Sequence, residues 1–93
     1  MPRTSNKSDR EHVLLVEDDR ALRELLTEEL RDANIPVTAV ESAEAAIPKI
    51  ADLQPDLIVS DLRLPGRDGM ELLHEVKQLP DAPSFLIITG FGT

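Results

Sequence analysis

Four short apolar segments, separated by stretches with the periodicity of helices, are the feature of this sequence that most restricts its fold. They are 13–16 (VLLV), 36–40 (PVTAV), 57–60 (LIVS) and 84–89 (SFLIIT). Short runs rich in Val, Ile and Leu are typical of strands that are buried on both faces of a parallel sheet. The connections are too long for hairpins and long enough for helical crossovers. The sequence therefore predicts the α/β class, with a small doubly wound parallel sheet.

Three amphipathic stretches fill the connections between the predicted strands. We expect helices over 20–34, from Ser42 through Ile50 or Leu53, and over 70–79. In the first stretch leucines recur at helical spacing among charged residues, and Asn34 is expected to end the helix. In the second, Ser42 can cap the start, but Pro48 lacks the N–H that a helix interior needs. We therefore expect this helix to bend at Pro48 or to begin later than Ser42.

The composition fits one small folded domain and excludes several classes of function. The chain has 93 residues, a formal net charge of −8, two phenylalanines as its only aromatic residues, and no cysteine. Disulfides and thiolate sites are therefore excluded, and an acidic chain with so few aromatic residues is poorly suited to nucleic acid. No segment approaches the roughly 20 apolar residues that span a membrane. We expect a cytoplasmic protein in which residues 1–12 form a flexible polar leader and residues 13–93 form the domain.

Acidic residues follow two of the predicted strands. Glu17 and Asp18 come directly after the first, and Asp61 comes directly after the third. Reactive groups of open parallel sheets gather at the carboxyl ends of the strands, although acids also occur there simply as helix caps. Two carboxylates about 4 Å apart repel by about 4 kcal/mol at an effective dielectric of about 20. A shared pocket would therefore require a raised pKa on one acid or a bound cation, for which Mg²⁺ suits an all-oxygen site. A third carboxylate would then be free to attack phosphorus.

Three segments carry a resemblance to a known family. They are VLLVEDD at 13–19, DLIVSDLRLPGRDG at 56–69 and LIITG at 86–90. In their order and spacing they resemble the receiver domain of two-component response regulators, over residues 13–93. The spacing of Asp61, Pro65 and Gly69 makes this similarity specific. It implies the flavodoxin-like receiver fold, whose strand order is 2-1-3-4-5.

The resemblance also implies roles for five residues. Asp61 is expected to be the phosphoacceptor and Asp18 a direct Mg²⁺ ligand, with Glu17 acting through a bound water. Arg63 would offer its backbone carbonyl to the metal, and the Thr89 hydroxyl would bind the phosphoryl group as the switch residue. A sensor histidine kinase would donate the phosphoryl group. The labile product implies slow autodephosphorylation, which differs from the turnover of a conventional enzyme.

Part of the family's pattern is missing from this chain. Receivers have five strands and five helices, whereas this sequence ends after the fourth predicted strand, so the expected fold is an incomplete receiver. The lysine of the family's fifth strand is absent, and we do not expect Lys49 or Lys77, on predicted helices, to replace it. The edge of the fourth strand would be exposed, which predicts self-association or a longer parent chain. Residues 89–93 resemble receivers joined to sigma-54-dependent activators, which implies an output domain that regulates transcription.

Two other functions remain open at this stage. The chain could be a receiver-like interaction module that accepts no phosphoryl group, which the missing lysine favours. It could also be a Mg²⁺-dependent phosphohydrolase with an aspartyl nucleophile. The second alternative is disfavoured because Asp61 is not followed by another acid two residues later, where Arg63 stands. Phosphorylation at Asp61 is the function that the motifs favour.

Overall fold

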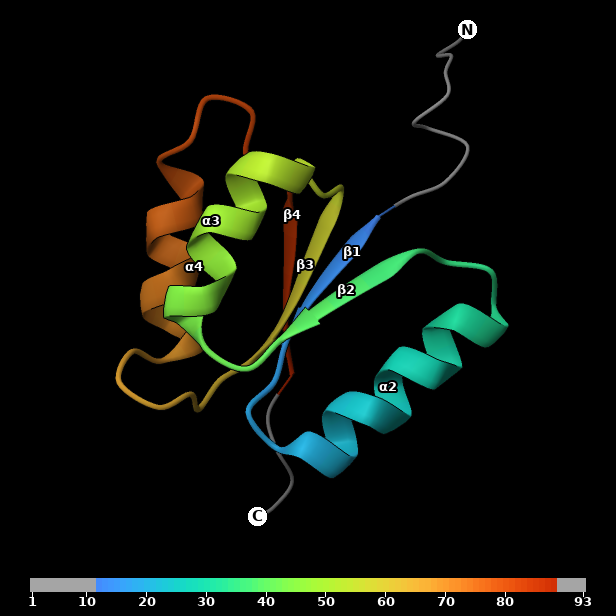
Figure 1. Ribbon diagram of the computed structural model, residues 1–93. Helices are drawn as coiled ribbons and strands as arrows, with labels where there is room; N and C mark the ends of the chain where they lie inside the picture. The colour runs from blue at the N-terminus through green and yellow to red at the C-terminus, as the bar shows by residue number, and fades with distance from the viewer. Residues whose placement is uncertain (1–11, 89–93) are drawn as a thin grey trace, which may run out of the picture.

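The fold is a parallel sheet with helices on both faces (Figure 1). The structure, a computed structural model, describes residues 12–88. Its elements are β1 (Val13–Val16), α2 (Arg20–Asp32), β2 (Val37–Val40), α3 (Ala43–Leu53), β3 (Leu57–Asp61), α4 (Gly69–Lys77) and β4 (Ser84–Ile88). The strands pair in the order β2-β1-β3-β4, and every pairing is parallel. The predicted α/β class and doubly wound sheet are therefore confirmed.

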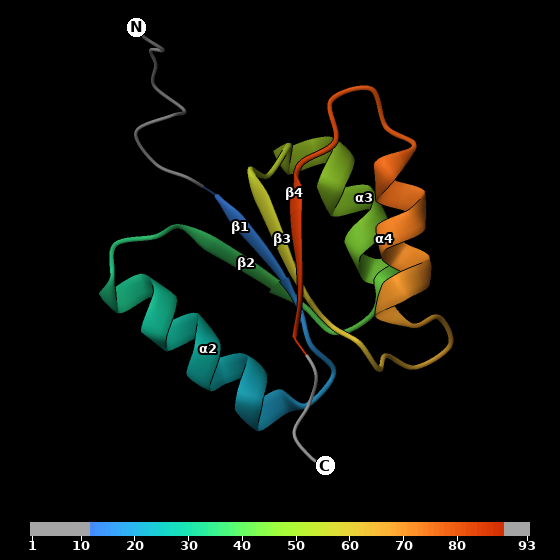
Figure 2. The same ribbon diagram turned by 180° about the vertical axis from the view of Figure 1, so that it is seen from behind.

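The sheet separates two hydrophobic clusters. Helix α2 covers one face, while α3 and α4 lie side by side on the other (Figures 1 and 2). Strand β1 contributes to both clusters, because successive side chains of a strand point to opposite faces. Leu14 and Val16 pack with α3 and α4, whereas Val13 and Leu15 pack with the α2 side. All four side chains of β1 are buried, as predicted for a central strand.

Side-chain caps define where the helices begin. Asp19, Ser42 and Asp68 each accept a hydrogen bond from a backbone N–H in the first turn of the following helix, at 3.1, 3.1 and 2.9 Å. These bonds satisfy N–H groups that have no partner within the helix. Beyond α2, Asn34 adopts a positive φ of 64°, which few residues other than glycine tolerate as readily. The expected cap at Ser42 is confirmed, whereas α2 ends at Asp32, two residues before the predicted end at Asn34.

Helix α3 differs from one expectation. It begins directly after Ser42 and continues through Pro48 to Leu53, so the later start considered for this helix is wrong. The cap at Ser42 and burial of Ala43, Ala46 and Ile50 hold the first turns in place. Pro48 is exposed. Capping and burial therefore outweigh the missing backbone donor.

Several element boundaries differ by one or two residues from those predicted. Strand β2 begins at Val37 and not at Pro36, and α4 spans Gly69–Lys77 instead of 70–79. Strand β3 extends to Asp61, so the acid is the last residue of the strand and not the first of the loop. Thr89, expected at the end of the fourth strand, lies outside the described residues.

His12 belongs with the folded domain, although the sequence placed it in the leader. Its backbone N–H donates to Asp56 Oδ2 at 3.0 Å, and its carbonyl accepts from the Asp56 N–H at 2.9 Å. Its ring Nε2 lies 2.9 Å from Thr38 Oγ1. These contacts fix His12 at the amino end of the sheet. Within residues 12–88, no helix has the length and apolar character needed to cross a membrane.

Gly69 allows α4 to start directly against the end of β3. Its N–H donates to Leu62 O at 2.7 Å. A Cβ atom at this position would lie 2.4 Å from Asp61 O and 3.1 Å from Leu62 Cα, closer than nonbonded atoms approach. Only glycine fits here without movement of the backbone that carries Asp61.

We expect Gly69→Ala to lower the free energy of unfolding by about 3 kcal/mol, the upper part of the range for overpacked sites, because the clash is with backbone and not with a flexible side chain. Met70→Ala is the matched control, since Met70 is 51% exposed on the same helical turn and should change stability by less than about 0.5 kcal/mol. Urea unfolding followed by circular dichroism measures both. Equal stability of the two variants would contradict this account of Gly69.

Candidate functional site

Three carboxylates meet at the carboxyl end of the two central strands. Glu17 and Asp18 follow β1, and Asp61 ends β3. The parallel pairing of Val16 with Ser60 brings these acids to the same edge of the sheet. One carboxylate oxygen from each residue lies within 4.8 Å of the others. The adjacency predicted from the positions of the acids is confirmed.

Glu17 is the most deeply buried of the three acids. The residue is only 1% exposed. Its Oε2 accepts a hydrogen bond from the Asp19 N–H at 3.0 Å, while Oε1 is buried and has no hydrogen-bond partner in the described structure. Burial raises the pKa of Glu17 above its ordinary value; the hydrogen bond from Asp19 opposes this, and the charges of Asp61 and Asp18 add to it. A buried carboxylate oxygen without a donor favours either a proton or a cation beside it.

Asp61 and Asp18 are held more loosely than Glu17. Asp61 is 8% exposed, and its Oδ1 lies 3.5 Å from the Arg63 N–H, at the outer limit of a hydrogen bond. The Asp18 side chain is exposed. The pocket therefore has a closed side at Glu17 and an open side at Asp18. A ligand approaching from solvent would meet carboxylate oxygens that strong hydrogen bonds do not already occupy.

No lysine of the described segment lies at this edge of the sheet. Lys49 is on α3 and Lys77 ends α4, as predicted. The two ion pairs of the described segment, Arg20–Glu24 and Arg67–Glu75, are on the surface and do not include the three acids. The negative charge of the pocket is thus not balanced by a salt bridge among residues 12–88.

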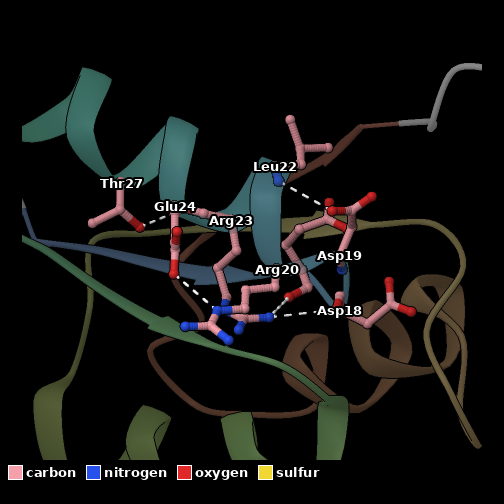
Figure 3. Close-up of polar contacts among 8 residues, drawn as sticks. Asp18, Asp19, Arg20, Leu22, Arg23, Glu24 and Thr27 are labelled. Atoms are coloured by element: carbon pink, nitrogen blue, oxygen red, sulfur yellow. Dashed lines mark hydrogen bonds and ion pairs between the residues drawn. The ribbon is translucent and has the colours of Figure 1, made fainter.

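Sequence reasoning missed one residue that contacts this region. Arg23, on α2, donates from Nη1 to Glu17 O at 2.9 Å and to Asp18 O at 3.4 Å (Figure 3). It had been counted among the charged residues of the helix surface. The only available signal was its place one turn after the Asp19 cap, which directs a long side chain back toward the preceding loop.

Comparison with known proteins identifies the family. Residues 13–93 match the family described as "Response regulator receiver domain". The chain belongs to this family. The receiver is 46% identical over 81 residues to the response regulator protein FleR of Pseudomonas aeruginosa, and 34% identical over 78 residues to the DNA-binding transcriptional regulator NtrC of Escherichia coli K12. These alignments cover 86% and 84% of this chain but only 17% of each relative.

Solved structures agree with this assignment. The receiver superposes with a TM-score of 0.82 on the response regulator TrrA of Thermotoga maritima, whose structure is a complex with Mg²⁺-BeF. The two are 28% identical, and the match covers 88% of this chain and 71% of TrrA. The expected flavodoxin-like receiver fold is confirmed for the four strands and three helices described.

The donor set of the receiver fits Mg²⁺. All three acids offer oxygen, the ligand type that this ion prefers, and no described His or Cys joins the cluster. Glu17 Oε1, buried and without a partner, is the observation that most favours a cation. The individual roles assigned to Glu17, Asp18, Asp61 and Arg63 remain predictions.

The raised pKa of Glu17 gives a pH-dependent stability in the absence of Mg²⁺. Because the folded chain holds this proton more tightly than the unfolded chain, the stabilisation is fully present below pH 4.5 and is lost as the pH rises through the folded pKa. Glu17→Gln keeps the uncharged form at every pH. We therefore expect the variant to be more stable than the wild type at pH 7 in EDTA, with the difference shrinking toward pH 4.5.

Thermal unfolding between pH 4.5 and 8 in EDTA measures this difference. Glu28→Gln is the control, because Glu28 is an exposed acid of α2. Addition of Mg²⁺ should make the wild type the more stable of the two proteins, because the ion stabilises the wild type more than it stabilises Glu17→Gln. A wild type that is the more stable of the two at pH 7 in EDTA is incompatible with this description of the pocket.

Proposed function

We propose that Asp61 accepts a phosphoryl group from the phosphohistidine of a sensor histidine kinase. The single observation that carries this proposal is the cluster of three carboxylates, in which a buried Glu17 oxygen has no donor. Membership in the receiver family supports it. Asp61 is the best placed nucleophile, because it is fixed at a strand end and retains access to solvent.

Each residue of the pocket would have a distinct task. A carboxylate oxygen of Asp61 forms a bond to phosphorus while the bond from phosphorus to the histidine nitrogen breaks. Asp18, Asp61 and the carbonyl of Arg63 would hold Mg²⁺, and Glu17 would contact it through water. Bound Mg²⁺ would supply positive charge to the oxygens of the transferring group. Because the acyl phosphate is labile, water would slowly remove the group again.

Thr89 is the proposed switch hydroxyl. It lies outside the described residues, and the register of the preceding residues supports the assignment. Ile88 pairs with Asp61, so β4 reaches the edge of the sheet where the acceptor lies, and Thr89 is the next residue of the sequence. A hydroxyl there would bind a phosphoryl oxygen and report that the group is present.

The partners follow from the same proposal. The chain spans 17% of FleR and of NtrC, and NtrC is described as a DNA-binding transcriptional regulator. We propose that the receiver passes its state to an output domain that regulates transcription, of the sigma-54-dependent activator type. Phosphotransfer would take place in the cytoplasm, and the receiver itself would contact neither nucleic acid nor membrane.

Incubation with a small phosphodonor tests the proposal. We expect the intact mass to increase by one phosphoryl group in the presence of Mg²⁺ and not in EDTA. Asp61→Asn should abolish the increase, because the amide is not a nucleophile. Asp52→Asn, which alters an exposed acid on α3, should leave it intact. Treatment with hydroxylamine should remove the group, as expected of an acyl phosphate.

Other outcomes would favour the two alternatives. A folded chain that gains no mass under any of these conditions would support the interaction module. Continuous hydrolysis of many phosphoesters would support the phosphohydrolase. Mass addition that persists in Asp61→Asn would contradict the choice of acceptor.

We further propose that the chain associates with a second copy through β4. In the described structure β4 pairs only with β3, and Leu86 on it is 51% exposed. The strand, SFLII, carries neither charge nor proline, the features that usually protect an edge from pairing. Backbone groups on this edge could pair with the same edge of another copy.

Sedimentation velocity of the 93-residue chain over a range of concentrations should show a mass that rises with concentration. Leu86→Lys should shift this association to concentrations about tenfold higher, because a charge at the edge costs on the order of 1 kcal/mol when it is desolvated. Leu25→Lys changes an equally exposed leucine, 52% exposed on α2, and should have no such effect. A wild type that stays monomeric at every concentration would rule out this interface.

A further inference from the structure

Arg23 is the one cation of the described segment that contacts the backbone of the acidic site. Its Nη1 lies 2.9 Å from Glu17 O and 3.4 Å from Asp18 O. Arg20, one turn away on the same helix, instead pairs with Glu24 and leaves 81% of its side chain exposed. Figure 3 shows the Arg23 side chain extending from α2 toward the loop of Asp18. The two arginines thus have equal charge and different contacts.

The two carbonyls that Arg23 contacts belong to the peptide units on either side of the Asp18 Cα atom. The planes of these two peptides determine the direction in which the Cα–Cβ bond of Asp18 points. Asp18 itself is exposed and no other element packs against its side chain in the hydrophobic clusters of the described residues, so the backbone sets the direction from which its carboxylate extends. A guanidinium bound to both carbonyls therefore fixes the direction of a side chain that it does not touch.

Arg23 is itself held firmly. Its N–H donates to Asp19 O at 2.8 Å, and its carbonyl accepts from Thr27 Oγ1 at 2.7 Å. The loop is also fixed at its other end, where the Glu17 N–H donates to Val40 O at 3.0 Å. The segment 17–19 is thus bound to β2 on one side and to α2 on the other.

We infer that Arg23 is a positioning residue that pre-arranges the carboxylates of Glu17 and Asp18 for binding Mg²⁺ beside Asp61. The inference rests on the proposed function for the identity of the ion. Groups that orient metal ligands without touching the metal commonly change its affinity by about 10–100-fold. Through its backbone contacts Arg23 acts on two of the three ligands at once.

The charge of Arg23 and its hydrogen bonds have opposite effects on the affinity for Mg²⁺, which makes the inference testable. As a cation near the pocket, Arg23 repels Mg²⁺, so loss of its charge alone would tighten binding. As a positioning residue it favours binding, so loss of its hydrogen bonds would weaken it. Arg20→Gln removes the same charge from the same helix without touching the loop, and it is the matched control.

Isothermal titration of the full chain with Mg²⁺ separates these effects. We expect Arg23→Gln to weaken Mg²⁺ binding about tenfold, whereas Arg20→Gln should bind as the wild type does or slightly more tightly. Arg23→Lys should fall between them, because its ammonium group can still donate to these carbonyls but lacks the rigid, planar geometry of the guanidinium. Equal affinities of Arg23→Gln and Arg20→Gln, or tighter binding by Arg23→Gln, would overturn the inference.

Amide hydrogen exchange in EDTA gives a second measurement without the metal. The Asp19 N–H, which donates to Glu17 Oε2, should exchange faster in Arg23→Gln and in Arg23→Lys than in the wild type, while the amides of Leu14 and Leu15 in β1 keep their protection. A uniform loss of protection along β1 would indicate general destabilisation and overturn the specific role. If Arg23→Gln does not fold, Arg23→Lys replaces it in both measurements. Weaker Mg²⁺ binding and faster exchange of the Asp19 amide would support the positioning role, and wild-type values would overturn it.

Failure of the positioning role of Arg23 can be distinguished from failure of the proposed function. If the wild type binds Mg²⁺ but accepts no phosphoryl group, the proposed phosphotransfer fails and the affinities still decide the role of Arg23. If Asp61 is phosphorylated while Arg23→Gln binds Mg²⁺ as tightly as the wild type, the function stands and the positioning role fails.

Discussion

The parallel pairing of β1 with β3 is the interaction on which the rest of this structure depends. It aligns Val16 with Ser60, and the acids that follow must then share one edge of the sheet. The pairing is stabilised from both sides, since the side chains of β1 enter a cluster with α3 and α4 on one face and a cluster with α2 on the other. Burial of the apolar side chains in these two clusters stabilises the pairing and so compensates for the repulsion between the acids that it brings together. The central core therefore brings the acids together, although Glu17 and Asp18 lie in the loop between β1 and α2.

Three neighbouring acids at the carboxyl edge of the sheet repel one another, and this repulsion destabilises the fold. Glu17 is buried beside Asp61 and Asp18, and one of its oxygens has no donor. Natural structures satisfy nearly all buried polar groups, and the exceptions often mark sites of binding or chemistry. Here the unfavourable free energy of burying a carboxylate falls on Glu17, which directly follows the buried strand β1.

The sequence predicted the elements well because their causes are local. The apolar runs and the cap at Ser42 act within a few residues and were found where the residues indicated, and α2 ends two residues before Asn34, which has a positive φ. The start of α3 stayed open between two alternatives because burial of Ala46 and Ile50, which outweighs the effect of Pro48, is not visible along the chain. The adjacency of the acids was predicted because parallel strands bring their carboxyl ends together.

Other features depend on contacts between distant segments, which the sequence does not reveal. His12 was placed in the leader because its link to Asp56 joins residues 44 positions apart. The contact of Arg23 with the backbone of Glu17 and Asp18 depends on the angle at which α2 leaves the sheet. The sequence marked Gly69 only through its spacing from Asp61 and Pro65, and the structure identifies the atom that a side chain there would meet, the carbonyl oxygen of Asp61.

The two ends of the described chain lie at opposite edges of the sheet. His12 is anchored at the amino end of β3 through Asp56, whereas Ile88 is in register with Asp61 at the carboxyl end. An affinity tag or fluorescent protein fused before residue 12 would accordingly be remote from the acidic pocket. The same fusion attached after residue 93 would be separated from Ile88 by only five residues and could obstruct the docking of another macromolecule at Asp61.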